Sequence, residues 1–206
     1  MRLMQNRLFI GLIYGVVFLG AALIGGLVLW VVLAALFGLA VGEMGRLLAA
    51  EPPFMGLGAV GWLVLVFLSV AILRGYFGAD VALGFLASAF LFDTASYYGG
   101  RALAGPPLVP AISPNKTWSG FIAGSACVVL ASHWLIPGQA GTVTLVFALI
   151  LSVLFLAGDL LVSVFKRRAG LKDAGRLLGA HGGVLDRVDS LLLATPLYWL
   201  MLVSVG

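Results

Sequence analysis

Residues 8–42 read LFIGLIYGVVFLGAALIGGLVLWVVLAALFGLAVG, an apolar run without one formally charged side chain. A helix that crosses a membrane needs about 20 such residues. The run is therefore too long for one ordinary crossing and long enough for two short ones. Gly25-Gly26 is the expected break, because glycine weakens a helix and tolerates the positive φ of a tight turn.

The composition of the whole chain extends this interpretation. Of the 206 residues, 62% are hydrophobic and 10% are charged, whereas soluble domains carry about 25% charged residues. This excludes an ordinary soluble domain, and the apolar content excludes a disordered chain. The single cysteine, Cys127, excludes an intramolecular disulfide framework and a cysteine-rich zinc site. We expect an all-α, polytopic integral membrane protein with a single transmembrane domain over residues 1–206.

Apolar runs that are bounded by charged residues or by proline and glycine predict about seven transmembrane helices. Their expected bounds are 8–24, 26–41, 57–73, 79–98, 119–136, 142–165 and 188–205. With a cytoplasmic N-terminus, every Lys and Arg except Arg74 falls on the cytoplasmic side, as the positive-inside rule requires. The net charge of +4 then reflects topology and not nucleic-acid binding. We expect a multi-pass protein of the inner (plasma) membrane whose functional site faces the cytoplasm.

Four aspartates are placed to meet near that face. An aspartate in the middle of a membrane helix costs about 2.5–3.5 kcal/mol, so it persists where it is partnered or useful. Asp93 and Asp159 lie near the cytoplasmic ends of their helices, and Asp186 and Asp189 share a helical face. The alternative is that each acidic residue only pairs with a nearby arginine. That alternative is plausible for Asp186 with Arg187 and is preferred for Glu43 with Arg46 (the residues are adjacent or one turn apart).

Asp159, Ser163 and Lys166 recur at helical spacing and form one polar stripe. A stripe of this kind in an apolar helix is expected to face a polar cavity. From the residues alone, we therefore expect a site that handles phosphate or a metal ion.

The segment 163–189, SVFKRRAGLKDAGRLLGAHGGVLDRVD, carries many polar positions at fixed spacing. It is similar, position by position, to the signature of the phosphatidate cytidylyltransferase (CDP-diacylglycerol synthase) family. FDTASYYGGR (92–101), SPNKTWSG (113–120) and Gly158-Asp159 resemble further segments of that family. The chain departs from it in being shorter, with apolar segments missing between the expected helices 26–41 and 79–98, and in having Gly179 where proline is common.

The resemblance implies that the cytidylyl group of CTP is transferred to phosphatidic acid, which gives CDP-diacylglycerol and pyrophosphate in phospholipid biosynthesis. It also implies Mg²⁺, with room for a second cation, and a homodimer. Magnesium is held by carboxylates that leave positions for phosphate oxygens, and Lys and Arg complete such a site. Other CTP-dependent lipid enzymes (a polyprenol kinase or an ether-lipid cytidylyltransferase) remain alternatives. A membrane transporter is a third, although transporters tend to place polar sites near the membrane midplane.

Carried onto this sequence, the family pattern assigns three kinds of site residue. Metal ligands are expected at Asp159, Asp186 and Asp189, with Asp93 as the next candidate. The expected catalytic set adds Lys166 and Lys172 to Asp159, Asp186 and Asp189. Substrate contacts are expected from Ser113, Lys116, Ser163, Arg167, His181, Gly182, Gly183 and Arg187.

Overall fold

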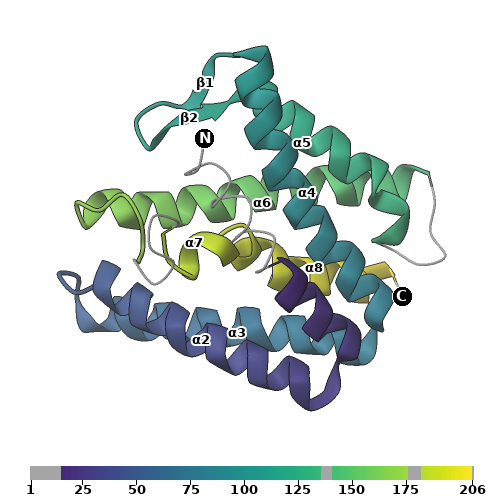
Figure 1. The fold of residues 1–206 in the computed structure, drawn as a ribbon, viewed down its shortest axis with the longest axis horizontal. Coiled ribbons are helices and arrows are strands. Elements are labelled where there is room, and N and C mark those ends of the chain that lie inside the picture. The colour runs from purple at the N-terminus through teal and green to yellow at the C-terminus, as the bar shows by residue number, and fades with distance from the viewer. Residues whose placement is uncertain (1–14, 136–140, 176–181, 206) are drawn as a thin grey trace.

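Helices make up most of the chain in the computed structural model, which describes residues 15–135, 141–175 and 182–205 (Figure 1). A first helix, Gly15–Ile24, is followed by α2 (Gly26–Leu47), α3 (Pro53–Tyr76), α4 (Ala79–Leu103), α5 (Trp118–Leu130), α6 (Thr142–Arg168), α7 (Leu185–Val188) and α8 (Leu191–Val205). Between α4 and α5 lies an antiparallel hairpin of β1 (Pro107–Val109) and β2 (Ser113–Thr117), and a 3-10 turn, η1 (Ser132–Trp134), follows α5.

Four of the described helices, α2, α3, α4 and α6, are long and apolar enough to cross a membrane. Leu27, Leu57 and Leu130 point outward with 78%, 76% and 79% of their surfaces exposed. Soluble monomers rarely present extended apolar surface of this kind, so helix length and surface together indicate a membrane protein. The predicted count of seven includes α5 and α8, which have 13 and 15 residues and are shorter than the roughly 20 of a straight crossing.

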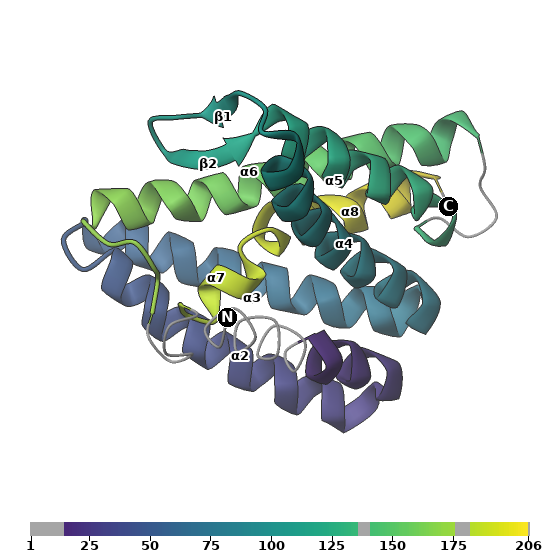
Figure 2. The ribbon, with the colours of Figure 1, turned by 45° about the horizontal axis from the view of Figure 1, so that its top comes forward.

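The C-terminal helices α7 and α8 lie in the middle of the molecule, between the α2–α3 pair and α6 (Figures 1 and 2). α4 contacts α8 directly through Phe85 and Tyr198, and α4 and α5 pack closely along each other. Small residues permit that approach, since a Cβ atom on Gly99 or Gly124 would collide with the facing helix. Every helix that carries a predicted site residue therefore reaches the same central region.

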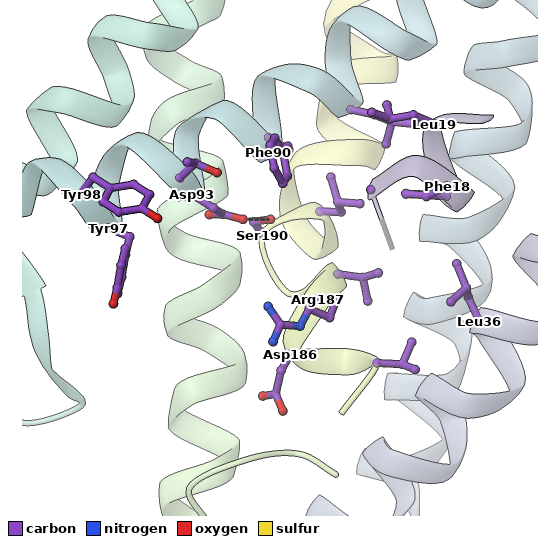
Figure 3. Close-up of a pocket in the computed structure, with 17 residues that line it drawn as sticks. Phe18, Leu19, Leu36, Phe90, Asp93, Tyr97, Tyr98, Asp186, Arg187 and Ser190 are labelled. Carbon is purple, nitrogen blue, oxygen red and sulfur yellow. Dashed lines mark hydrogen bonds between the residues drawn. The ribbon is translucent and has the colours of Figure 1, made fainter. Parts of the chain in front are cut away.

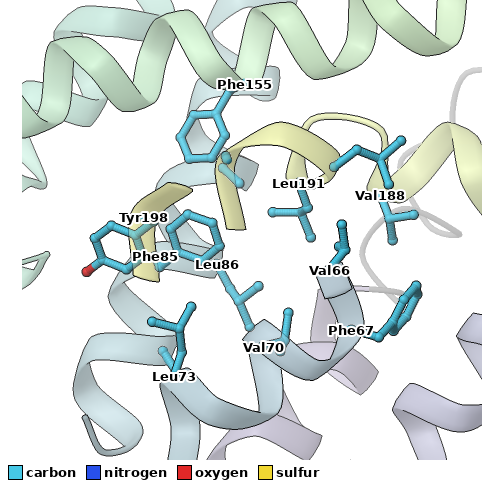
Figure 4. Packing of buried hydrophobic residues seen from close by; sticks show 14 of the residues in the cluster. Val66, Phe67, Val70, Leu73, Phe85, Leu86, Phe155, Val188, Leu191 and Tyr198 are labelled. Carbon is cyan, nitrogen blue, oxygen red and sulfur yellow. The ribbon is translucent and has the colours of Figure 1, made fainter. Parts of the chain in front are cut away.

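An aromatic cluster fixes α4, α6 and α8 relative to one another (Figure 4). The ring of Phe85 stacks on that of Tyr198 with a centroid separation of 4.6 Å and lies 5.8 Å from that of Phe155. Phe155 also contacts Phe92. Because Phe155 precedes Asp159 by about one turn of α6 and Phe92 directly precedes Asp93, this core sets the positions of two candidate site residues.

Two local breaks show how composition shapes the helices. Gly25 and Gly26 have φ of 68° and 53°, so the predicted turn between the first helix and α2 is present. Pro52-Pro53 is also a break, but α3 begins at Pro53 and not at residue 57, because proline suits the first position of a helix, where no N–H partner is needed.

Two features were not predicted from the sequence. The β1–β2 hairpin occupies residues expected to be loop, and its register pairs Pro107 with Thr117. The expected helix 188–205 is instead the separate pair α7 and α8, with a turn at Asp189-Ser190. Within α8, Pro196 cannot donate to the Leu192 carbonyl. The indole N–H of Trp62 on α3 donates to that carbonyl instead, at 2.9 Å.

Candidate active site

Asp159 on α6 and Lys116 on β2 form an ion pair that fixes the hairpin against the helix. The hydroxyl of Ser163, one turn further along α6, lies 3.4 Å from the other Asp159 oxygen and donates to it. Thr117 ends the hairpin and caps α5, because its hydroxyl accepts a hydrogen bond from the Gly120 N–H at 3.1 Å. The short β2–α5 junction therefore carries a lysine directly to a helix carboxylate that is distant in sequence.

Lys166 and Asp186 form a second, more buried pair. The Lys166 Nζ atom lies 2.7 Å from Asp186 Oδ1, and only 10% and 11% of the two side chains are exposed. Asp186 Oδ2 accepts hydrogen bonds from the N–H groups of Ala174 and Gly183, at 2.9 and 2.8 Å. Both oxygens of Asp186 thus bind other parts of this chain, and the aspartate joins α6 to the two ends of the segment between residues 174 and 183.

Asp189 lies in the turn between α7 and α8 and is only 8% exposed. One of its oxygens accepts a hydrogen bond from the Ser190 N–H, and the Ser190 hydroxyl donates to Asp93 at 3.3 Å. Burial raises the pKa of the Asp189 carboxyl well above its usual range, and the negative charges of Asp159 and Asp93 raise it further. The three carboxylates are therefore close enough to repel one another.

The approach of Asp189 to α6 depends on the residue before Asp159. A Cβ atom on Gly158 would collide with the backbone carbonyl oxygens of Asp189 and Ser190. Glycine at this position lets the α7–α8 turn contact the α6 backbone directly. In the Gly158-Asp159 pair noted in the sequence, the glycine therefore allows close packing, while the aspartate supplies the charge.

A polar cavity of about 310 Å³ lies among these groups. Asp93, Asp159, Asp186 and Asp189 all line it, together with Lys116 and Arg187. Lys166 does not line it, and acts on the cavity through Asp186. The four predicted aspartates are thus gathered around one hollow, although they approach it from four different elements.

A second cavity, of about 470 Å³, adjoins the first (Figure 3). Asp93, Tyr97, Asp186 and Arg187 line both cavities. Away from those shared residues the second cavity becomes apolar, with Phe18, Leu19, Leu36 and Phe90 around it. The polar cavity and this second, apolar cavity therefore meet at the four residues that they share.

The donor set suits a hard cation only in part. Carboxylates are the ligand type that Mg²⁺ prefers, and the polar cavity is lined by four of them, Asp93, Asp159, Asp186 and Asp189. Both oxygens of Asp159 and both oxygens of Asp186 already have partners within the chain. Within the described parts of the chain, however, no three His, Cys, Asp or Glu side chains are grouped so as to hold a metal ion themselves. Mg²⁺ commonly takes one or two carboxylates and completes its shell with water and substrate phosphates, and the cavity fits that arrangement.

Other predicted site residues take different positions. Arg167 lies against backbone carbonyls, with donors 3.3 Å from Ile112 O and 3.1 Å from Leu171 O, so it joins the hairpin tip to the end of α6. Lys172 is exposed, and Ser113 begins β2 opposite Val109. Gly182 and Gly183 lie against Asp186 and Glu43. His181 lies outside the described residues.

Glu43 is the main residue whose position was not anticipated. Arg46 does approach it, at 4.0 Å, but Arg46 is 58% exposed while Glu43 is fully buried. The Glu43 carboxylate accepts hydrogen bonds from the N–H groups of Val184 and Leu185. In the sequence, Glu43 stands at the end of an apolar run, much as in relatives of the family that the chain resembles. Asn115 and Tyr97, which also line the polar cavity, lie within segments already noted for other residues.

Comparisons with known proteins show the family to which the chain belongs. The profile of the Cytidylyltransferase family matches residues 53–205. A protein of Brucella suis biovar 1 (strain 1330) named phosphatidate cytidylyltransferase is 49% identical over 144 residues, which cover 65% of this chain and 51% of the relative. A protein of the same name from Staphylococcus aureus (strain COL) is 42% identical over 119 residues, covering 56% of this chain and 46% of the relative. The chain spans about half the length of these curated relatives.

The matched region contains the hairpin lysine, all four aspartates of the polar cavity and the buried Lys166–Asp186 pair. Since this match covers most of the chain and the whole of that charged centre, the chain belongs to the cytidylyltransferase family.

Proposed function

We propose that this chain transfers the cytidylyl group of CTP to phosphatidic acid and releases pyrophosphate. The observation that carries the proposal is the junction of a carboxylate-lined cavity with an apolar one at Asp93, Asp186 and Arg187. A reaction between a water-soluble nucleotide and a lipid phosphate needs both environments side by side. The family assignment and the names of the relatives support the nucleotide and lipid named here.

The proposed reaction requires little proton transfer from the protein. An oxygen of the lipid phosphate attacks the α-phosphorus of CTP, and the bond from that phosphorus to the β-phosphate oxygen breaks. The lipid phosphate is already ionised near neutral pH, so no strong general base is needed. The protein instead has to bring two polyanions together and stabilise the charge that develops on pyrophosphate, mainly by positioning and electrostatics.

Each charged group of the cavity has a distinct part in this proposal. Lys116, held by Asp159, lies at the hairpin side of the polar cavity and would bind nucleotide phosphate. Arg187 lines both cavities and would contact the lipid phosphate. Asp186 would hold α6 and the backbone at Ala174 and Gly183 together, since its oxygens already bind Lys166 and these two N–H groups.

Asp159 and Asp189, with Asp93 beside them, would hold Mg²⁺, because their oxygens line the same cavity and their negative charges repel one another. The ion supplies charge neutralisation of the phosphate oxygens. The absence of a complete three-residue cage among the described residues fits an ion that is held partly by substrate.

The apolar cavity would take the glycerol end and part of an acyl chain. Phe18, Leu19 and Leu36 offer it hydrocarbon contacts, while Asp93 and Arg187 stand at its polar boundary. A lipid seated here would keep its tails in an apolar environment and present its phosphate to the polar cavity.

The orientation in the inner (plasma) membrane belongs to the same proposal, with seven crossings and the charged cavity on the cytoplasmic side. The positive-inside distribution of Lys and Arg supports it. The test uses a Cys127→Ser background with a new cysteine in place of exposed Lys172. A membrane-impermeant maleimide should label it in inside-out vesicles and not in right-side-out vesicles; the reverse pattern would overturn the orientation.

Two radiolabels test the reaction. Purified protein in mixed micelles receives CTP labelled at the α- or the γ-phosphorus, with phosphatidic acid, an ether-linked lipid phosphate or a polyprenol as acceptor. Label from the α position, and none from the γ position, should appear in lipid with phosphatidic acid. Transfer of γ label to polyprenol would identify a kinase. Preference for the ether-linked lipid phosphate would replace phosphatidic acid as the assigned substrate. No transfer at all would favour a transporter.

A further inference from the structure

We propose that Glu43 is a positioning residue that holds the backbone directly before Asp186 and thereby sets the geometry of the active site. This inference concerns the reaction of the proposed function and therefore rests on it. Glu43 belongs to α2, which precedes the matched region 53–205. It lines neither the polar nor the apolar cavity, so any effect on the reaction must pass through other residues.

The contacts of Glu43 are specific for a carboxylate. One oxygen accepts from the Val184 N–H at 3.1 Å, and the other accepts from the Leu185 N–H at 2.8 Å. These two N–H groups open the short helix α7, where no earlier turn of helix supplies them with a carbonyl partner. The two N–H groups donate to different oxygens. Glutamine would place an NH₂ donor at one of those two positions, so it cannot reproduce both bonds in this geometry.

The space around the carboxylate is shaped to fit it. A Cβ atom on Gly175 or on Gly183 would collide with the Glu43 carboxylate. Gly175 and Gly183, although eight positions apart in the sequence, therefore both approach the same carboxylate. The Glu43 side chain is itself fully buried, and a buried polar group depends on its hydrogen-bond partners for stability.

Glu43 and Asp186 hold adjacent parts of one segment. Asp186 binds the N–H groups of Ala174 and Gly183 and pairs with Lys166. Glu43 binds the next two N–H groups along the chain, directly before Asp186. Release of the backbone at Val184 and Leu185 would therefore loosen Asp186 and Arg187, which line both cavities, and then Asp189 in the following turn.

The test compares Glu43→Gln and Glu43→Asp with Arg46→Ala in the full chain. Arg46 is a matched control because it lies on the same helix, 4.0 Å from Glu43, and is mostly exposed. Hydrogen exchange followed by mass spectrometry reports on the segment without requiring any activity. In Glu43→Gln, peptides covering residues 182–190 should exchange about tenfold faster, while peptides from α3 and α6 change less than about twofold. Arg46→Ala should change neither.

Kinetics then connect that loosening to the reaction. Glu43→Gln should lower kcat by about tenfold or more and leave KM for CTP within about twofold, since Glu43 touches neither cavity. Glu43→Asp keeps both acceptor oxygens and should restore part of kcat.

Unchanged exchange at residues 182–190 would overturn the proposal, and so would uniformly faster exchange in α3 and α6, which would make Glu43 a residue of general stability. Faster local exchange with wild-type kcat would overturn the link to catalysis. If the wild-type protein transfers no nucleotide, the proposed function fails, and the exchange result still decides whether Glu43 holds the segment.

Discussion

Replacing Lys166 with methionine tests whether the buried pair with Asp186 organises the site. Methionine keeps most of the side-chain volume and removes the charge. The Asp186 side chain is only 11% exposed, and the substitution would remove the Lys166 Nζ atom that lies 2.7 Å from its Oδ1 atom. Breaking a buried pair by removing one partner costs about 3–5 kcal/mol, because the remaining charge is uncompensated.

That loss is large enough to measure by thermal unfolding in detergent. For a chain of this length, 1 kcal/mol shifts Tm by about 2–4 °C, so Lys166→Met should lower Tm by roughly 10 °C. The control is Lys172→Met, which removes the same charge from an exposed position and should change stability by less than about 0.5 kcal/mol.

The double variant Lys166→Met/Asp186→Asn separates loss of the pair from loss of packing. An asparagine oxygen can still accept from the Ala174 and Gly183 N–H groups, while its NH₂ group faces the uncharged methionine. The double variant should therefore be more stable than Lys166→Met alone, with a coupling energy of about 0.5–3 kcal/mol. Strictly additive losses of Tm would refute the view that the two side chains act as a pair.

Three further predictions concern the metal, one carboxylate and one helix contact. Transfer of the cytidylyl group should stop in excess EDTA and return on addition of Mg²⁺, and normal turnover in EDTA would contradict the metal assignment. Asp189→Asn should reduce turnover by about a hundredfold or more with unchanged membrane insertion, and full activity would remove Asp189 from the site. Trp62→Phe should lower the free energy of unfolding by about 1 kcal/mol, because the Leu192 carbonyl loses its indole donor; an unchanged unfolding curve would mean that another donor replaces it.

Long apolar runs predicted the helical, membrane-embedded character of the fold, because a run of about 20 apolar residues favours a membrane-crossing helix without any tertiary contact. The glycine pair at 25–26 was a reliable break for the same reason: its backbone freedom is a property of the residues themselves. The β1–β2 hairpin escaped prediction because its strands are short and contain Pro107 and Pro114, with Pro110 in the turn between them. Short strands leave too few alternating positions for a pattern to appear.

For the site, spacing indicated which residues could share a face, and tertiary contacts decided what each one does there. Asp159, Ser163 and Lys166 do follow one side of α6, yet Asp159 faces the cavity while Lys166 turns to Asp186. Arg167, with the same charge as Lys166, binds two carbonyls at the hairpin and the end of α6. The role of Glu43 depends on contacts with residues more than a hundred positions away, which no local pattern encodes.

The contact between Glu43 and the backbone at Val184 and Leu185 also affects where a shortened version of this protein can begin. A recombinant fragment designed on the family boundary would begin near Pro53 and would discard the acceptor of two buried N–H groups. Such a fragment would keep every charged residue of the polar cavity. It would still lack the carboxylate that binds the backbone directly before Asp186. We therefore expect the smallest catalytically active piece of the chain to be larger than the region that sequence similarity marks out.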